Sequence, residues 1–597
     1  MKIFNGLLKL SAVAAAVLGM NACGSNSGEA SSNAGWDSVV AGNAEAQKKL
    51  ELIPSYDMIP DNAVMAVKIM PGQLFDKTLG DPGSQGYELW EDFRDEIIAE
   101  LYSEDEMNGM LAGLIESPEF FGVSVDEPIV LSFAGNFDNV MRDEAAMEIF
   151  LTTRVADRGR FEAFVNMVLA RIDSDEEVKK QVVNSTYTHY EIAKDNMDGL
   201  ALDMALMGDI VVARFTADTI DGISDLKTSM QSLFANYGPK KTEGLLDFYA
   251  SQADMAVWID LERGSDLALP VLKAQDPTTA AQLEQFMPLY KGASFVTDLT
   301  FMDGKTVLEM RTFGSDALKA NAVKYNTSSS DKFFNHLPYT SAVVVNVAIK
   351  DFPGLVDQLC ATNADYAEAF EMLELYAGLD KSVYAGFPGV MTMALDGEGL
   401  DDRDIPGFAL CMECKENVWD LIREYLGEIA SKVGANKYSI QGEVYVSYNG
   451  DAVIMTDKNT ERKIRNGYRT FAEAPMAHVV RNSGMMIDLN NIPRNLISTA
   501  LEEVGDVMTV NEFLEFISSA SITVAPDFMT STLTLNMNDK QHNLLEKLVL
   551  FIAEHPELME QSYDYDDYGY YGYDYDYDYD FDYGYSDTSS YYYDYNY

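Results

Sequence analysis

The segment FMDGKTVLEM at residues 301–310 decides the fold, because a related segment, FMTSTLTLNM, occurs at residues 528–537. Each reads as the turn and second strand of a hairpin, with apolar residues in alternation. The residues ahead of them, ASF at 293–295 and ASI at 520–522, keep the same offset of 227 residues (528 − 301). A hairpin that recurs at a fixed distance indicates an internal repeat.

Three further matches occur in the same order along the chain. They are WIDL at 258–261 with MIDL at 486–489, GDIVVA at 208–213 with GDAVIM at 450–455, and AVMAV at 63–67 with AVVVN at 342–346. Ordered matches of this kind predict that the chain is a duplication of one structural unit.

Both copies have the same predicted content, namely strands joined by short turns with helices between the hairpins. Helices are indicated by apolar residues three and four apart, as at Phe161, Phe164, Val165 and Val168, or at Val418, Leu421, Ile422 and Tyr425. We therefore predict an α+β fold of two tandem related repeats, 56–325 and 330–558, each with antiparallel sheets covered by helices on one face. The polar stretch at 325–331 is the expected joint.

Segments at the start of the first repeat resemble a known family. IPDNAV at 59–64 opens a strand and helix, and SPEFFGV at 117–123 precedes EPIV at 127–130. Together they resemble the envelope lipoproteins of Bacteroidota that are grouped as a domain-of-unknown-function family, over most of residues 50–556. The resemblance implies an exported, lipid-anchored, internally duplicated protein of the outer membrane. It supplies no catalytic residue.

The first 22 residues, 1–22, read as a lipoprotein signal peptide. Lys2 and Lys9 form a charged leader, residues 10–18 are apolar but too short to span a bilayer, and small residues lead to Cys23. We predict lipidation at Cys23, a tether at 23–55, and stable membrane attachment through the acyl chains. No later run approaches the ~20 apolar residues of a membrane helix.

The resemblance also bears on which side of the outer membrane the protein occupies. In that group, surface export is associated with acidic residues directly after the lipidated cysteine, and here the following segment GSNSGE has one, Glu29. The periplasmic face is therefore favoured, and the cell surface is the alternative.

The chain is strongly acidic, with 96 Asp and Glu against 43 Lys and Arg and a formal net charge of −53. Such a surface repels nucleic acid and anionic lipid headgroups over roughly 8 Å in physiological salt. Nucleic acid is therefore excluded as a partner. The expected partners are the membrane, through the anchor, and a protein or a glycan, with basic proteins and divalent cations matching the charge.

Three cysteines follow Cys23, so at most one internal disulfide can form. Cys411 and Cys414 have the spacing of a redox-active dithiol. The duplication aligns them with Thr152 and Val155 on a strand, where side chains three residues apart point to opposite faces. We therefore expect structural cysteines.

Two hairpin connections are rich in oxygen donors, residues 396–404 and their counterpart 136–144, but neither has the spacing of an EF-hand loop. Solvated turns are expected there. The histidines are too scattered along the chain to form a zinc motif: His189, His336, His478, His542 and His555. No cofactor or metal site is predicted, and weak Ca²⁺ binding by the acidic segments is left open.

Catalytic motifs are incomplete. Ser224 and Lys227 have the Ser-x-x-Lys spacing of penicillin-recognising enzymes, but the companion Ser-Asp-Asn and Lys-Thr-Gly elements are missing. The sequence also lacks a Gly-x-Ser-x-Gly motif, a phosphate-binding loop and a dinucleotide fingerprint. No catalytic residue is predicted.

The C-terminal segment at 560–597 has an extreme composition. Between Tyr563 and Tyr597 it contains sixteen Tyr and ten Asp in 35 residues, without a basic residue. Unpaired like charges oppose collapse, so a disordered tail is predicted. Stacking on glycans, weak Ca²⁺ binding and docking into a basic groove of a partner are the functional alternatives to a solvated extension.

These observations favour a lipid-anchored envelope protein that acts as a non-enzymatic binding or assembly scaffold. One alternative is an envelope hydrolase whose site is assembled from residues distant in sequence, which would require convergent carboxylates or a Ser-His pair in a deep pocket. The other is a surface glycan-binding lipoprotein, which would require exposed aromatic side chains on the folded repeats.

Overall fold

The computed structural model describes residues 59–79, 116–136, 146–169, 177–183, 187–193, 200–217, 242–362, 385–398, 407–493 and 512–555, with scattered positions between 86 and 114 and between 367 and 383. The chain divides into two compact units, Met1–Leu550 and Phe551–Tyr597. The fold described below is that of the first unit.

The described strands fall into two sets of ten. The first set is β1 (Ala63–Ile69), β2 (Ile129–Asn136), β3 (Ala146–Arg154), β4 (Glu177–Val183), β5 (Tyr187–Ala193), β6 (Leu200–Met207), β7 (Ile210–Ala217), β8 (Met255–Asp260), β9 (Ser294–Met302) and β10 (Lys305–Phe313). The second set is β11 (Ser341–Ile349), β12 (Gly389–Asp396), β13 (Phe408–Glu413), β14 (Ser431–Gly434), β15 (Lys437–Ile440), β16 (Val444–Tyr448), β17 (Ala452–Asp457), β18 (Gly484–Asp488), β19 (Ile517–Val524) and β20 (Thr530–Met537).

Helices lie between the strands. The α-helices are α4 (Pro71–Leu79), α7 (Arg158–Leu169), α9 (Glu243–Ala250), α10 (Leu261–Gln275), α11 (Pro277–Tyr290), α12 (Asp316–Ala322), α13 (Phe352–Thr362), α16 (Glu416–Ile429), α17 (Lys458–Arg465) and α20 (Leu544–Glu554). Short 3₁₀ helices are η2 (Pro118–Phe121), η5 (Phe334–His336), η6 (Phe471–Glu473) and η7 (Leu489–Asn491).

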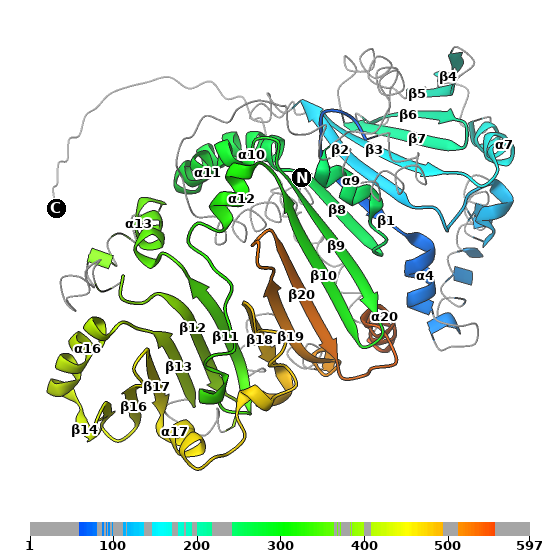
Figure 1. Ribbon diagram of the computed structural model, residues 1–597. Coiled ribbons are helices and arrows are strands. Elements are labelled where there is room, and N and C mark those ends of the chain that lie inside the picture. Colours follow the sequence, from blue (N-terminus) through cyan, green and yellow to red (C-terminus); the bar gives the residue numbers. More distant parts are fainter. Residues whose placement is uncertain are drawn as a thin grey trace, which may run out of the picture. The chain divides into compact units, whose positions relative to one another are not determined.

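The described strands form one antiparallel sheet. Its order is β4-β5-β6-β7-β3-β2-β1-β8-β9-β10-β20-β19-β18-β11-β12-β13-β17-β16-β15-β14. The predicted α+β class is confirmed. We expected separate sheets in the two halves, but β10 pairs with β20 from Lys305 opposite Asn536 to Arg311 opposite Thr530, as Figure 1 shows. The pairing satisfies two strand edges that would otherwise be free.

The two sets of strands pair in the same pattern. Adding ten to each strand number of the first set converts every pairing of that set into a pairing of the second. Irregularities correspond as well, because β1 shifts register between Ala63 and Met65 and β11 between Ser341 and Val343.

The observed register differs by one residue from the expected match of AVMAV at 63–67 with AVVVN at 342–346. Ala66 lies opposite Trp258, and Val344 lies opposite Met486. Since Trp258 matches Met486, Ala66 corresponds to Val344 rather than to Val345 as the AVMAV and AVVVN segments suggested. A one-residue shift on a strand exchanges its two faces, so it changes which side chains are equivalent.

The hairpin match shifts by two residues in its first strand and by four in its second, where Met310 opposite Thr297 corresponds to Leu533 opposite Ile522, an offset of 223 residues (533 − 310). Phe295 lies opposite Ile259, and Ala520 lies opposite Ile487. The strands β9 and β19 therefore correspond at an offset of 225 residues (520 − 295). The second hairpin also has a longer connection, because β9 and β10 are joined by two residues and β19 and β20 by residues 525–529.

The aspartates in the WIDL and MIDL segments have the same local role. Asp260 caps α10 by accepting a hydrogen bond from the backbone N–H of Arg263 (3.0 Å). Asp488 caps η7 by accepting one from the backbone N–H of Asn490 (3.1 Å). A carboxylate at this position satisfies an N–H group that the helix itself leaves unpaired.

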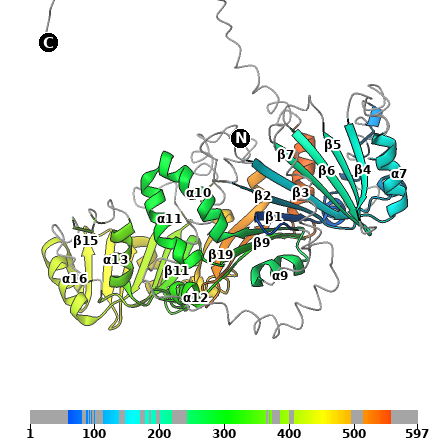
Figure 2. The same ribbon diagram turned by 90° about the horizontal axis from the view of Figure 1, so that it is seen from above.

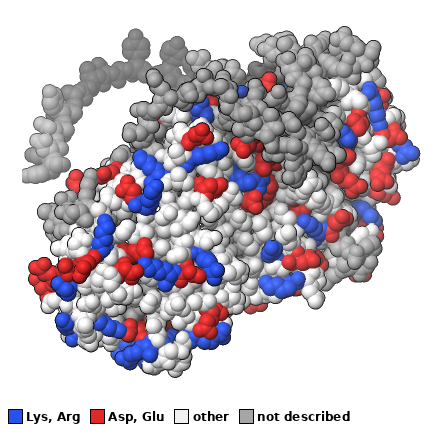
Figure 3. Space-filling view, in the orientation of Figure 1, with Lys and Arg blue, Asp and Glu red and all other residues white. Residues whose placement is uncertain are grey.

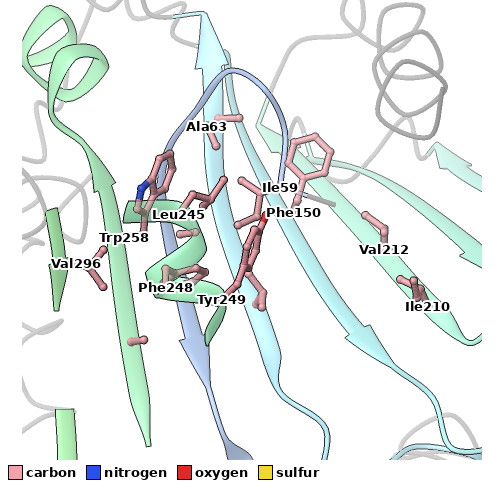
Figure 4. Close-up of a cluster of buried hydrophobic side chains, with 14 of the residues drawn as sticks. Ile59, Ala63, Phe150, Ile210, Val212, Leu245, Phe248, Tyr249, Trp258 and Val296 are labelled. Atoms are coloured by element: carbon pink, nitrogen blue, oxygen red, sulfur yellow. The ribbon is translucent and has the colours of Figure 1, made fainter. Parts of the chain in front are cut away.

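Helices cover both faces of the sheet in the first half, whereas we expected them on one face. Residues of α9, namely Leu245, Phe248 and Tyr249, pack in one buried cluster with Trp258 and Val296 of the sheet (Figure 4). Residues of α10, α11 and α12 pack on the neighbouring side chains, and Figure 2 shows α9 on the opposite face from α10 and α11. Each large side chain buried in this way stabilises the fold by about 1.5–3 kcal/mol.

The predicted joint at 325–331 is part of the packed structure. Tyr325 and Ser329 are buried. The backbone N–H of Lys350 donates to the carbonyl oxygen of Tyr325 (2.6 Å), and the hydroxyl of Ser329 donates to Oδ1 of Asn346 (2.9 Å). The segment is thus hydrogen-bonded to β11 and to the residue that directly follows that strand.

Candidate functional site

Several residues singled out in the sequence lie outside the described residues. These are the lipidation residue Cys23 with its signal peptide and tether, Ser224 and Lys227, and the Tyr and Asp tail at 560–597.

Cys411 lies within β13, Cys414 directly follows that strand, and both are buried. Cys411 packs in the cluster that contains Val344 and Ile454, whereas Cys414 packs in a different cluster with Val418 and others. Burial raises the pKa of Cys411 to about 12 and that of Cys414 to about 11. Thiols with such pKa values carry almost no thiolate at neutral pH and are poor nucleophiles.

The acidic connection after β12 begins with a carboxylate that the chain itself engages. Asp396 is fully buried, and its carboxylate accepts hydrogen bonds from Nζ of Lys463 (2.7 Å) and from the hydroxyl of Thr340 (2.6 Å). Lys463 also pairs with Glu398. Residues 399–404 and the corresponding 137–144 lie outside the described residues.

The histidines within the described part of the chain contact separate local groups. Nδ1 of His478 contacts the carbonyl oxygen of Pro475 (2.7 Å), and Nδ1 of His542 contacts Asp539 (2.6 Å). Among the described residues, no three His, Cys, Asp or Glu side chains are grouped so that they could hold a metal ion.

A buried lysine that no sequence motif indicated lies on β1. Lys68 is 1% exposed, and its ammonium group donates to the carbonyl oxygens of Phe248 (3.0 Å) and Ser251 (2.5 Å). These carbonyls are at the C-terminal end of α9, where a positive charge is favourable. Burial nevertheless lowers the pKa of Lys68 from 10.5 to about 8, against the opposing effect of Asp298 and Asp247.

Close to Lys68, Arg311 forms ion pairs with three carboxylates. Arg311 on β10 donates to Asp247 of α9 (2.7 Å) and to Asp298 of β9 (2.6 Å), and it also pairs with Glu309. Burial raises the pKa of Asp247, with Arg311 opposing that shift. Arg311 therefore joins α9 to the two strands beneath it.

The second half has a neutral residue where the first has Lys68. Lys68 lies opposite Ala256, and Asn346 lies opposite Gly484, the corresponding position of β18. Asn346 is completely buried and its amide donates to the carbonyl oxygens of Val480 (2.8 Å) and Arg481 (3.1 Å). Both residues thus donate to backbone carbonyls from the same position of corresponding strands.

Lys68, Asp298 and Glu309 belong to a single row across the sheet. Partners in register run from Lys68 through Ala256, Asp298, Glu309, Thr532, Thr523 and Gly484 to Asn346. Of the row's four members from the first half, all but Ala256 are charged, and the four from the second half are neutral. The neutral residues of β11, β18, β19 and β20 occupy the positions that correspond to those of the charged half. Charged side chains are therefore not required for strands to pair in this arrangement.

The buried charged groups around Lys68 and Arg311 direct their hydrogen bonds into the protein. Catalysis by such groups requires an acid or base that can reach a substrate atom. Here the hydrogen bonds described above for Lys68, Asp247 and Arg311 join the protein's own carbonyls, carboxylates and guanidinium group. These contacts therefore connect helix α9 to the sheet.

Exposed aromatic side chains occur at separate places in the fold. Phe120 in η2, Tyr425 in α16 and Tyr468 after α17 are 69%, 63% and 63% exposed, respectively. Leu421, which shares the apolar spacing of this helix with Tyr425, is also 49% exposed. The spacing predicted the helix correctly, and within α16 the buried residues are Val418, Trp419 and Leu426.

Comparison with known proteins supplies no relative. No protein-family model matches the chain, and neither the curated proteins nor the solved structures include a significant match. None of the helices in the described part of the chain is both long and apolar enough to cross a membrane.

Proposed function

We propose that this protein is a lipid-anchored component of the cell envelope that acts as a non-enzymatic binding or assembly scaffold. The anchor would be Cys23, attached to the outer membrane with the periplasmic face favoured, and the folded body would be held on the tether at 23–55. The proposed family is that of the duplicated Bacteroidota envelope lipoproteins.

The body would consist of two repeats related by duplication. The strand pairings support this relation, because the ten strands of each half pair in the same pattern and have a register shift at the same place. The corresponding positions of Lys68 and Asn346 support the duplication further. Lys68 donates a hydrogen bond to the carbonyl oxygen of Phe248, and Asn346 donates one to that of Val480.

The observation that carries the scaffold proposal is the continuous sheet through β10 and β20. Pairing of two repeats edge to edge joins them through backbone hydrogen bonds, so that both present one continuous surface to a partner. The buried ionisable groups support the same function, because the hydrogen bonds of Lys68, Asp396 and Arg311 described above connect parts of the chain to one another.

The anchor is tested by replacing Cys23 with alanine in the native host. We expect the protein to move from the membrane fraction to the soluble fraction, with mass spectrometry of the wild-type N-terminal peptide identifying the acyl chains. A Cys23→Ala variant that stays in the membrane fraction after a high-salt wash would remove lipidation from the proposal. A Cys360→Ala variant is the matched control and should remain in the membrane.

The tail is tested by a chain that ends at Gln561. If the acidic tail contacts a partner, the truncated protein should keep the same melting temperature and lose co-purification of that partner. Unchanged co-purification would show that the tail has no such role.

A further inference from the structure

The helix α16 is fixed to the sheet by one face. Val418, Trp419 and Leu426 are buried on it, and the Trp419 ring stacks on Tyr448 with 5.2 Å between ring centres. Tyr438 packs edge-on against the same Trp419 ring at 6.3 Å. These contacts hold α16 against the sheet, and Ile422 packs on the same cluster.

Beside this buried face, α16 has an apolar stripe that the protein leaves exposed. Leu421, Tyr425 and Ile429 are 49%, 63% and 47% exposed, and Val433 on β14, which follows the helix in the chain, is 53% exposed. Residues four apart lie on the same side of a helix, so the three helical members form a connected strip. On the helix, this strip is about 12 Å long at 1.5 Å per residue.

An acidic row runs along the other side of the stripe. It is formed by Glu416, Asp420, Glu424 and Glu428, which are all exposed and again spaced by four residues. Like charges at this spacing destabilise an isolated helix by about 0.2–0.5 kcal/mol per pair. The helix contains one basic residue, Arg423, and it pairs with Asp420 (2.9 Å). Figure 3 shows acidic side chains at the end of the sheet where Figure 1 places α16.

The arrangement specifies its complement. A stripe of large apolar side chains attracts an apolar surface, and a parallel row of carboxylates attracts lysine or arginine beside it. We propose that the outer face of α16 binds a basic amphipathic segment of a partner protein. This inference rests on the proposed binding role and names the partner class for it.

A second copy of the chain fits this surface less well. An antiparallel contact between two α16 helices would bring two acidic rows together around the apolar stripe, and like charges at close range oppose association. A basic segment instead neutralises the row and covers the stripe in one contact. Helix-in-groove recognition commonly uses anchors with this i, i+4 spacing.

The test uses the complete mature chain in solution and a defined probe. The probe is a fluorescein-labelled 15-residue peptide of leucine and lysine, with the leucines four and three residues apart. Its control is a peptide of the same composition in an order that forms no apolar stripe. We expect saturable binding of the first peptide by fluorescence anisotropy, and at least tenfold weaker binding of the second.

Variants locate the binding. Leu421→Ser together with Tyr425→Ser should weaken the first peptide at least tenfold, because two exposed apolar contacts are lost at unchanged charge. Tyr468→Ser is the matched control, since Tyr468 has the same 63% exposure as Tyr425, and it should change nothing. Glu424→Gln with Glu428→Gln should weaken binding and reduce its salt dependence.

The same measurements can also contradict the proposal. Equal binding of both peptides, or equal affinity of the Leu421→Ser, Tyr425→Ser variant and wild type, would mean that a chain of net charge −53 merely attracts cations, and the proposal would fall. Self-association through α16, seen as dimers by sedimentation that the same variant abolishes, would overturn it in favour of a second copy. Because these measurements need no lipid, their failure leaves the anchoring test of Cys23 standing by itself.

Discussion

Replacing Lys68 by methionine should change how the stability of the fold depends on pH. Lys68 is buried and its pKa falls from 10.5 to about 8 on folding. The unfolded chain therefore binds this proton more tightly than the folded one, and stability rises with pH in that window. The gain is complete above 10.5 and is lost as the pH falls through 8.

The size of the effect follows from the two pKa values. Between pH 7 and pH 9.5, Lys68 should add about 2 kcal/mol to the free energy of unfolding. The Lys68→Met variant lacks this pH-dependent increment. At pH 7 the substitution also removes the hydrogen bonds from Lys68 to Phe248 and Ser251, which is a separate effect. The variant should therefore be less stable relative to wild type at pH 9.5 than at pH 7.

The assay is urea unfolding of both proteins, followed by tryptophan fluorescence at the two pH values. Trp258 is buried in the same cluster as Phe248 and reports on this region. Lys305→Met is the matched control, because Lys305 is an exposed lysine of β10, and its pH dependence should equal that of wild type. An identical pH dependence for Lys68→Met and wild type would refute the reasoning.

Three further outcomes follow from the buried polar groups. Asp396→Asn should lower the free energy of unfolding by about 3 kcal/mol in urea titrations, because it leaves the ammonium group of Lys463 without its buried partner. If the loss is below about 0.5 kcal/mol, the pair is not structural. Asn346→Leu should cost about 2–4 kcal/mol in the same measurement, because the carbonyls of Val480 and Arg481 lose their donor; an unchanged stability would contradict that role. Cys411 and Cys414 should resist iodoacetamide at pH 7.5 in the folded protein and react after unfolding; rapid labelling of both before unfolding would restore a redox role.

The pattern of apolar residues predicted much of the fold. Matches such as GDIVVA with GDAVIM are in the register that the sheet adopts, because a Gly-Asp turn fixes where the following strand starts. The α+β class and the different surroundings of Cys411 and Cys414 also agree with expectation. Local turns and alternation carry this information.

Other features could not be read from the chain. The run from Val343 to Val345 is apolar at every position, so alternation could not separate the register of β11 from one shifted by a residue. The pairing of β10 with β20 joins segments far apart in sequence and depends on matching edges, which leave no local signal. The one local signal for the buried lysine was its position: Lys68 lies within the otherwise apolar strand sequence AVMAVKI.

The central claim is that the folded body holds a partner at the membrane. The most direct measurement is native mass spectrometry of the protein released from its own membranes in mild detergent. The account predicts the acylated chain together with a bound protein partner, which is lost from the Leu421→Ser, Tyr425→Ser variant but retained by Tyr468→Ser. An acylated chain that is released alone from wild-type membranes would contradict it.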